Sequence, residues 1–138
     1  MNIIKKINHF NDQVMSFDVI ILFFRVAVSV QLIVVHGLKK IGIGTQMAEK
    51  VPNPFLLPDG LNQIFAIASN LVFPLFIIVG FYTRISTIPI LIVTLSGYFV
   101  VHWHDSLLEN DVPFMYSVSF LLIAFAGSGK YSIDSRLK

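Results

Sequence analysis

Apolar residues are concentrated in four long stretches of the chain, and only a few ionisable residues interrupt them. A helix rises about 1.5 Å per residue, so it needs roughly 17 to 25 residues to cross the hydrocarbon of a bilayer. Each stretch has a length near that range, although the fourth is the shortest. The sequence therefore predicts four transmembrane helices, at residues 17–37, 61–82, 85–104 and 112–127.

Before the first stretch, apolar residues recur with a helical period, at Ile3, Ile7, Phe10 and Val14. The polar residues around them fall largely on the opposite side, which is typical of an amphipathic helix lying in a membrane interface. We expect an all-α fold, a four-helix transmembrane bundle with an N-terminal interfacial helix, forming one domain over residues 1–138. The alternative for the first stretch is a cleavable signal peptide, against which Arg25 inside the apolar region argues.

Composition supports membrane insertion and excludes several classes of function. The chain is 55% hydrophobic and 13% charged, with a mean hydropathy of +0.76, which leaves too few polar residues to cover a soluble domain. It contains no cysteine, so it cannot perform thiol–disulfide exchange or hold an iron–sulfur cluster by itself. Any redox role would need a cofactor or a partner, and an enzyme acting alone is not the favoured interpretation.

The positions of the basic residues predict the orientation of the helices. Six fall on the side that carries both termini: Lys5, Lys6, Arg84, Lys130, Arg136 and Lys138. Three fall on the other side: Lys39, Lys40 and Lys50. Because basic residues favour the cytoplasmic side, we expect both termini to be cytoplasmic. The net charge of +2 thus reflects topology, and no nucleic-acid partner is expected.

Two proline-containing segments shape the expected path of the chain. Residues 45–60 carry three prolines around Phe55-Leu56-Leu57, a stretch too apolar for a free loop, so we expect it to fold back on the outer ends of the bundle. Pro74 lies inside the second helix and is expected to kink it. His36-Gly37, followed by Lys39 and Lys40, is expected to end the first helix.

Arg25 is the most costly residue to place in the bilayer. It shares a helical face with Ser29, Leu32 and His36, and an unpaired charge in hydrocarbon costs from about 3 to 10 kcal/mol or more. That face must therefore look into the bundle. The favoured interpretation is a structural anchor paired with Asn70, Asp134 or carbonyls at the Pro74 kink, and the alternative is a ligand site.

Histidines and polar residues near the outer helix ends are the other candidate site. His36 and His102 end the first and third helices, where a facing pair could hold a haem iron or donate to a quinone carbonyl. Two ordinary interfacial histidines are the alternative, and bulky neighbours argue against haem. His102 and His104 are two residues apart and do not chelate a metal from one helix, so no metal site is expected.

A polar stripe follows the third helix and adds Tyr98 to the candidates. Thr94, Tyr98, His102 and Asp105 are spaced by four, four and three residues, so they could line a site for a polar or quinone headgroup. Ordinary hydrogen bonding between helices is the alternative. The candidate ligand-pocket residues are Arg25, His36, Lys39, Asn70, Tyr98 and His102.

The order of short motifs resembles one known family over nearly the whole chain. The motifs are Arg25 with His36-Gly37-Leu38-Lys39-Lys40, Gly80-Phe81-Tyr82-Thr83-Arg84, and Gly127-Ser128-Gly129-Lys130-Tyr131-Ser132-Ile133-Asp134. Together they resemble the DoxX family of small bacterial membrane proteins. The resemblance implies a four-helix bundle in the bacterial inner membrane, linked to quinone-dependent or other membrane oxidoreductase complexes. Many relatives carry acidic residues where this chain has Ala68-Ser69-Asn70-Leu71 and Phe114-Met115-Tyr116.

Two functional hypotheses follow. The first is a non-catalytic scaffold or accessory subunit of a larger membrane complex. The second is a quinone-associated oxidoreductase subunit with a pocket near the outer ends of helices one and three. No intrinsic cofactor is expected, although quinone is possible. The expected partners are the lipid bilayer, other membrane or periplasmic proteins, and further copies of the chain.

Overall fold

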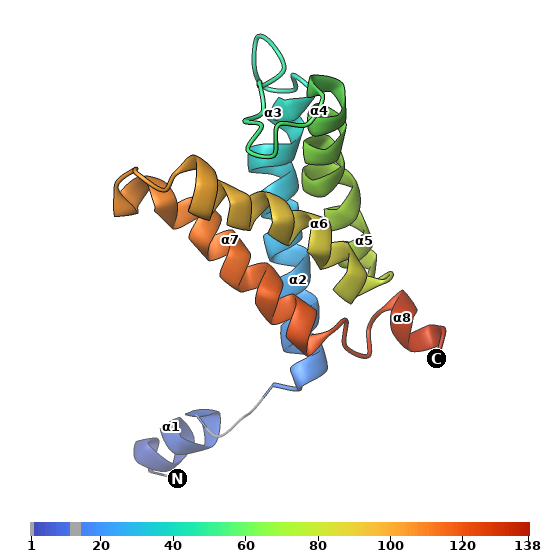
Figure 1. Ribbon diagram of the computed structural model, residues 1–138. Helices are drawn as coiled ribbons and strands as arrows, with labels where there is room; N and C mark the ends of the chain where they lie inside the picture. The colour runs from blue at the N-terminus through green and yellow to red at the C-terminus, as the bar shows by residue number, and fades with distance from the viewer. Residues whose placement is uncertain (1, 12–14) are drawn as a thin grey trace.

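The computed structural model describes residues 2–11 and 15–138, and all regular secondary structure in this part of the chain is helical (Figure 1). Three segments are π-helical, with one more residue per hydrogen-bonded turn than an α-helix. The elements in chain order are α1 (Ile3–Asn11), α2 (Phe17–Leu32), η1 (Ile33–Gly37), α3 (Leu38–Lys40), α4 (Asp59–Ile67), η2 (Ala68–Val72), α5 (Phe73–Val79), α6 (Thr83–Ser96), η3 (Gly97–Val101), α7 (Leu107–Ala126) and α8 (Ile133–Arg136).

These elements join into four helices that are long and apolar enough to cross a membrane: Phe17–Lys40, Asp59–Val79, Thr83–Val101 and Leu107–Ala126. The prediction of four transmembrane helices is confirmed, and the chain is a multi-pass membrane protein. The structure also has a helix at Ile3–Asn11. Its position in the membrane interface stays a prediction.

Several helix ends differ from those expected, and the second and third spans each begin two residues earlier and end three residues earlier, at Asp59–Val79 and Thr83–Val101. The first span continues to Lys40, so Gly37 does not end it, and the first left-handed residue of the turn is Gly42. The fourth span begins five residues before the expected position 112, at Leu107. It starts there because the Glu109 carboxylate accepts a hydrogen bond from the N–H of Ser106 at 3.2 Å, and Pro113 is accommodated inside the helix.

The four spans pack as two pairs that cross obliquely (Figure 1). The first span, α2–η1, lies beside the second, α4–η2–α5, while α6 packs against α7. Further contacts of α5 with α6 and of α2 with α7 close the bundle. The start of α2 meets the C-terminal tail, because Asp18 accepts a hydrogen bond from the N–H of Lys130 at 2.8 Å. We call this the termini end and the opposite one the loop end.

The interior of the bundle is rich in small polar side chains, and apolar side chains face outward. Buried apolar residues form one cluster: Ile21, Leu32, Ile77, Ile90, Phe120 and Ile123. Around it lie buried hydroxyls, of which Ser117 donates to Thr94 at 3.0 Å and so links α7 to α6. Small polar residues let membrane helices approach closely, and the exposed apolar side chains contact the lipid bilayer.

At the loop end, residues 41–58 fold back onto the second span. This agrees with the prediction made from the apolar, proline-rich sequence of the segment. The Asn62 amide donates to the carbonyls of Val51 and Pro52, at 3.4 and 3.1 Å. Glu49 pairs with Lys39 at 3.0 Å and with Lys40 at 3.1 Å. Burial would raise the pKa of the Glu49 carboxyl, but the hydrogen bonds and charges of both lysines outweigh it and hold that pKa below its ordinary value.

Gly37 is a point of close approach between the first two spans. Pro74 has no N–H to pair with the carbonyl of Asn70, and a Cβ placed on Gly37 would lie 2.5 Å from that carbonyl oxygen. The two helices can therefore touch only because residue 37 has no side chain. This contact explains why a glycine occurs inside a helix that it was expected to end.

We predict that Gly37→Ala lowers the stability of the bundle by about 1–3 kcal/mol, because the added methyl group must push the two spans apart. Gly60→Ala is the matched control, since it also lies in a helix but a Cβ there meets nothing within 4 Å. Thermal unfolding in detergent measures both variants. Equal melting temperatures for the two would contradict the close contact.

Candidate functional site

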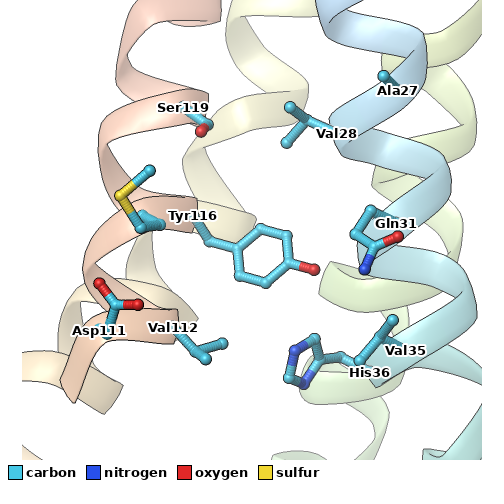
Figure 2. A pocket seen from close by; sticks show the side chains of 10 residues that line it. Ala27, Val28, Gln31, Val35, His36, Asp111, Val112, Tyr116 and Ser119 are labelled. Carbon is cyan, nitrogen blue, oxygen red and sulfur yellow. The ribbon is translucent and has the colours of Figure 1, made fainter. Parts of the chain in front are cut away.

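A groove with a volume of about 420 Å³ lies between the first and fourth spans (Figure 2). Its walls are mostly apolar: Ala27, Val28, Val35, Val112 and Met115. Five polar side chains also line it: Gln31, His36, Asp111, Tyr116 and Ser119. This composition, an apolar cleft with a few polar groups, is typical of small-molecule sites, and the volume lies within their usual range of about 300–1,000 Å³.

Helical spacing and one π-turn bring these side chains together. Ala27, Gln31 and Val35 are four residues apart, so they form one stripe on the first span. In an uninterrupted α-helix, His36 would share the buried face of Arg25 and Ser29. The extra residue in η1 shifts the residues that follow, so that Gly37 is buried while His36 is half-buried and lines the groove.

Tyr116 on α7 forms the opposite wall. Its ring meets the His36 ring edge to face, with centroids 5.3 Å apart, and stacks on Phe120 at 6.4 Å. Figure 2 shows the Tyr116 hydroxyl directed across the groove, toward Gln31 and His36. The three polar groups thus come from two different spans and face one space.

These polar groups have no hydrogen-bond partner within the described part of the fold. Among the described residues, no hydrogen bond joins the side chain of Gln31, His36 or Tyr116 to another group. A polar group without a partner in an apolar environment costs from about 1 to several kcal/mol. Such groups indicate a place where a bound molecule or water supplies the missing hydrogen bonds.

Arg25 occupies a separate, structural position, nearer the termini end of the same helix. Its side chain is 1% exposed, its Nη1 donates to the carbonyl of Ile77 at 3.0 Å, and its Nη2 donates to the carbonyl of Tyr131. Arg25 faces the interior of the bundle, as the helical spacing predicted. The direct partners differ from those expected, because they are carbonyls at the end of α5 and in the C-terminal tail.

Gly80 and Asp134 complete this anchor. Gly80 ends α5 in the left-handed conformation with φ 73°, and a Cβ there would collide with Nη1 of Arg25. Asp134 accepts hydrogen bonds from the N–H groups of Tyr82 and Thr83, at 2.7 and 2.9 Å, and so caps α6. Burial would raise the pKa of the Asp134 carboxyl, but the hydrogen bonds from these backbone N–H groups keep it below its ordinary value.

The remaining candidates lie outside the groove. His102 pairs with Asp105 at 2.5 Å and lines a second cavity, of about 130 Å³, near Lys40. His36 and His102 therefore line different cavities. The groove of His36 lies between the first and fourth spans, and the cavity of His102 is lined by Lys40 of the first span and by residues of the second and third spans. Asn70 donates to the carbonyl of Ala66 at 2.8 Å, within its own helix.

Tyr98 and Lys39 have structural contacts as well. The Tyr98 ring packs against Phe99 and Phe114, with centroids 4.9 and 5.8 Å apart. Lys39 is occupied by its ion pair with Glu49. Within the described residues, no three His, Asp or Glu side chains cluster in a way that could hold a metal ion. The expectation that the protein binds no metal stays a prediction.

Sequence reasoning missed Gln31 as a site residue and treated Tyr116 only as a position without an acid. A signal for Gln31 was present, because an amide in the middle of an apolar span has to find a partner. The position of Tyr116 opposite it depends on how the spans cross, which no spacing along one helix reveals.

Comparison with known proteins shows which family the chain is similar to. Residues 20–103 match the DoxX family model, a region that runs from α2 to the end of η3. A protein of Haemophilus influenzae described as uncharacterized is 30% identical over 98 residues, which is 67% of this chain and 65% of that protein. The match thus spans a little under two thirds of that relative's length. No solved structure matches the chain.

We predict that Arg25→Leu lowers the melting temperature in detergent and the yield of folded protein, because it leaves the carbonyls of Ile77 and Tyr131 without their donor. Arg25→Lys keeps the charge but not the forked geometry, so it should recover part of the loss. An unchanged or raised melting temperature in Arg25→Leu, together with loss of a co-purifying small molecule, would contradict the structural role.

Proposed function

The chain belongs to the DoxX family of membrane proteins, and we propose that it is an accessory subunit that holds an isoprenoid quinone in the groove between the first and fourth spans. The observation that carries this proposal is the group of unpartnered polar side chains, Gln31, His36 and Tyr116, that face one apolar groove. The family resemblance supports a quinone as the ligand, and the groove supports the position of its binding site.

The chemistry of the groove fits a quinone headgroup. Such a headgroup is a flat ring with two carbonyl oxygens, each of which accepts hydrogen bonds. The Gln31 amide, the Tyr116 hydroxyl and the His36 ring can all donate. Val35, Val112 and Met115 at the edge of the groove are exposed toward lipid, so an isoprenoid tail could leave the groove directly into the bilayer.

In such a complex, the role of this chain is to bind the quinone and to orient its headgroup. A bound quinone would supply two-electron redox chemistry. Gln31 and Tyr116 would fix the headgroup by its carbonyl oxygens, and the apolar walls would exclude water from it. The sequence has no cysteine to carry electrons itself, so we place the electron donor or acceptor on a partner membrane or periplasmic protein.

We predict that quinone extracted from protein purified in mild detergent falls about three- to tenfold in Gln31→Leu and in Tyr116→Phe, the loss of one hydrogen bond. Tyr98→Phe is the matched control, because Tyr98 does not line the groove. Chromatography with ultraviolet detection measures the quinone per protein.

Equal quinone content in Tyr116→Phe and Tyr98→Phe would contradict the groove as the site. Wild-type protein that retains neither endogenous nor added quinone, and co-purifies with stoichiometric partner proteins, would support a scaffold in place of a quinone subunit. Both benzoquinone and naphthoquinone forms should be added in this experiment, since the hydrogen-bond donors of the groove suit the two carbonyl oxygens of either class.

We further propose a bacterial inner-membrane location with both termini in the cytoplasm, which the excess of basic residues at the termini end supports. Single cysteines at the exposed positions Thr45 and Lys138 test it in this cysteine-free chain. An impermeant maleimide added to intact cells should label Thr45→Cys, and should label Lys138→Cys only after lysis. The reverse pattern would invert the topology.

A further inference from the structure

At the termini end, a hollow of about 860 Å³ lies between the starts of the first and third spans, the end of α7 and the C-terminal tail. None of its lining residues belongs to the groove described above. Three basic side chains line it, those of Arg84, Lys130 and Lys138, together with the carboxylates of Asp18 and Asp134. The hollow thus offers cationic side chains from two separate parts of the chain.

The two carboxylates are already used by the fold. Asp18 accepts the N–H of Lys130 at 2.8 Å, and Asp134 accepts two backbone N–H groups at the start of α6. Among the described residues, by contrast, no ion pair joins Arg84, Lys130 or Lys138 to an acid. Three basic side chains against two carboxylates leave the hollow with a net charge of +1, and the basic side chains are the ones without an ion-pair partner in the described chain.

Arg84 is held in place against the end of α7. Its Nη2 donates to the carbonyl of Phe125 at 3.2 Å. A Cβ on Gly127 would lie 3.4 Å from Nε and 3.5 Å from Nη2 of Arg84, so the guanidinium lies directly against this glycine. The Phe125 carbonyl accepts only one of the five N–H donors of the guanidinium. Others can serve a phosphate, whose oxygens match the fork of an arginine.

The depth of the hollow identifies the kind of anion. Asp18, Arg84 and Ala126 stand at or next to the ends of three membrane spans, so the hollow lies at the level of lipid headgroups. Exposed apolar side chains adjoin it, including Ile85 and, at 77% exposure, Phe125. A ligand there would have its anionic head beside Arg84 and Lys130 and its acyl chains along α6 and α7.

We propose that this hollow binds the phosphate headgroup of an anionic phospholipid. Basic pockets between membrane helices bind anionic lipids in this way, each basic residue contributing to affinity. The site is independent of the quinone proposal, because it lies at the termini end and uses different residues. It gives the protein a preference for anionic membranes that its groove alone would not supply.

The test uses the full chain in detergent micelles containing phosphatidylglycerol or, at the same mole fraction, phosphatidylcholine, and measures the melting temperature and lipid retention by native mass spectrometry. Phosphatidylglycerol should stabilise the wild type more than phosphatidylcholine does. In the double variant Arg84→Gln with Lys130→Gln, its affinity should fall about 30-fold, the effect of two interfacial charges. Lys50→Gln is the control with a charge removed at the loop end, and it should bind like the wild type.

Three results would overturn the proposal. They are an equal preference for both lipids in the wild type, an unchanged preference in the double variant, and stabilisation by inorganic phosphate alone equal to that by phosphatidylglycerol, which would indicate a free anion. Should the double variant fail to fold, Lys130→Gln alone decides, because its exposed side chain has no ion pair in the described chain. That single variant should bind phosphatidylglycerol about fivefold more weakly.

Discussion

The burial of Arg25 is the constraint on which the termini end of the bundle depends. A guanidinium inside a membrane bundle needs hydrogen-bond acceptors, and here Nη1 and Nη2 donate to carbonyls of α5 and of the C-terminal tail, while the buried Nε has no partner among the described residues. The need to place these carbonyls around Arg25 constrains the residues that surround it. Residue 80 must be a glycine, because any Cβ would collide with the guanidinium, and the tail must return to the bundle to provide the Tyr131 carbonyl. Asp134 then lies where it can cap α6.

At the loop end of the first span, the backbone geometry of η1 determines how the neighbouring helices pack. The π-turn in η1 places Gly37 against the carbonyl of Asn70, and it rotates His36 toward α7. One extra residue in a helical turn therefore has two consequences. It lets the first and second spans approach closely, and it moves a titratable side chain from the buried face to the groove. The candidate site exists because the helix is not regular there.

Hydropathy alone was enough to predict the number of spans, because the bilayer sets the length of each helix. The ends of the helices were less predictable. A glycine usually signals a helix end, but Gly37 allows close packing of two helices, and the fourth span begins at Leu107, before the expected position 112, with Pro113 inside α7. Periodicity predicted that Arg25 faces inward, yet not which carbonyls it binds. Sequence left open whether His36 and His102 face each other, and the structure places them in different cavities, because the π-turn and the oblique crossing of the spans are properties of the packed bundle.

The contrast between Arg25 and Gln31 separates structural from functional polarity in this protein. Both are polar residues of one apolar helix, six residues apart, and both would be unfavourable there without partners. Arg25 is buried and bonded by the fold, so its presence is explained by stability. Gln31 is exposed, lines an apolar groove and bonds to no described residue, so the fold gains nothing from its amide. A polar group that does not stabilise its own fold is best explained by what it binds, and Tyr116 directs a second such group at the same space.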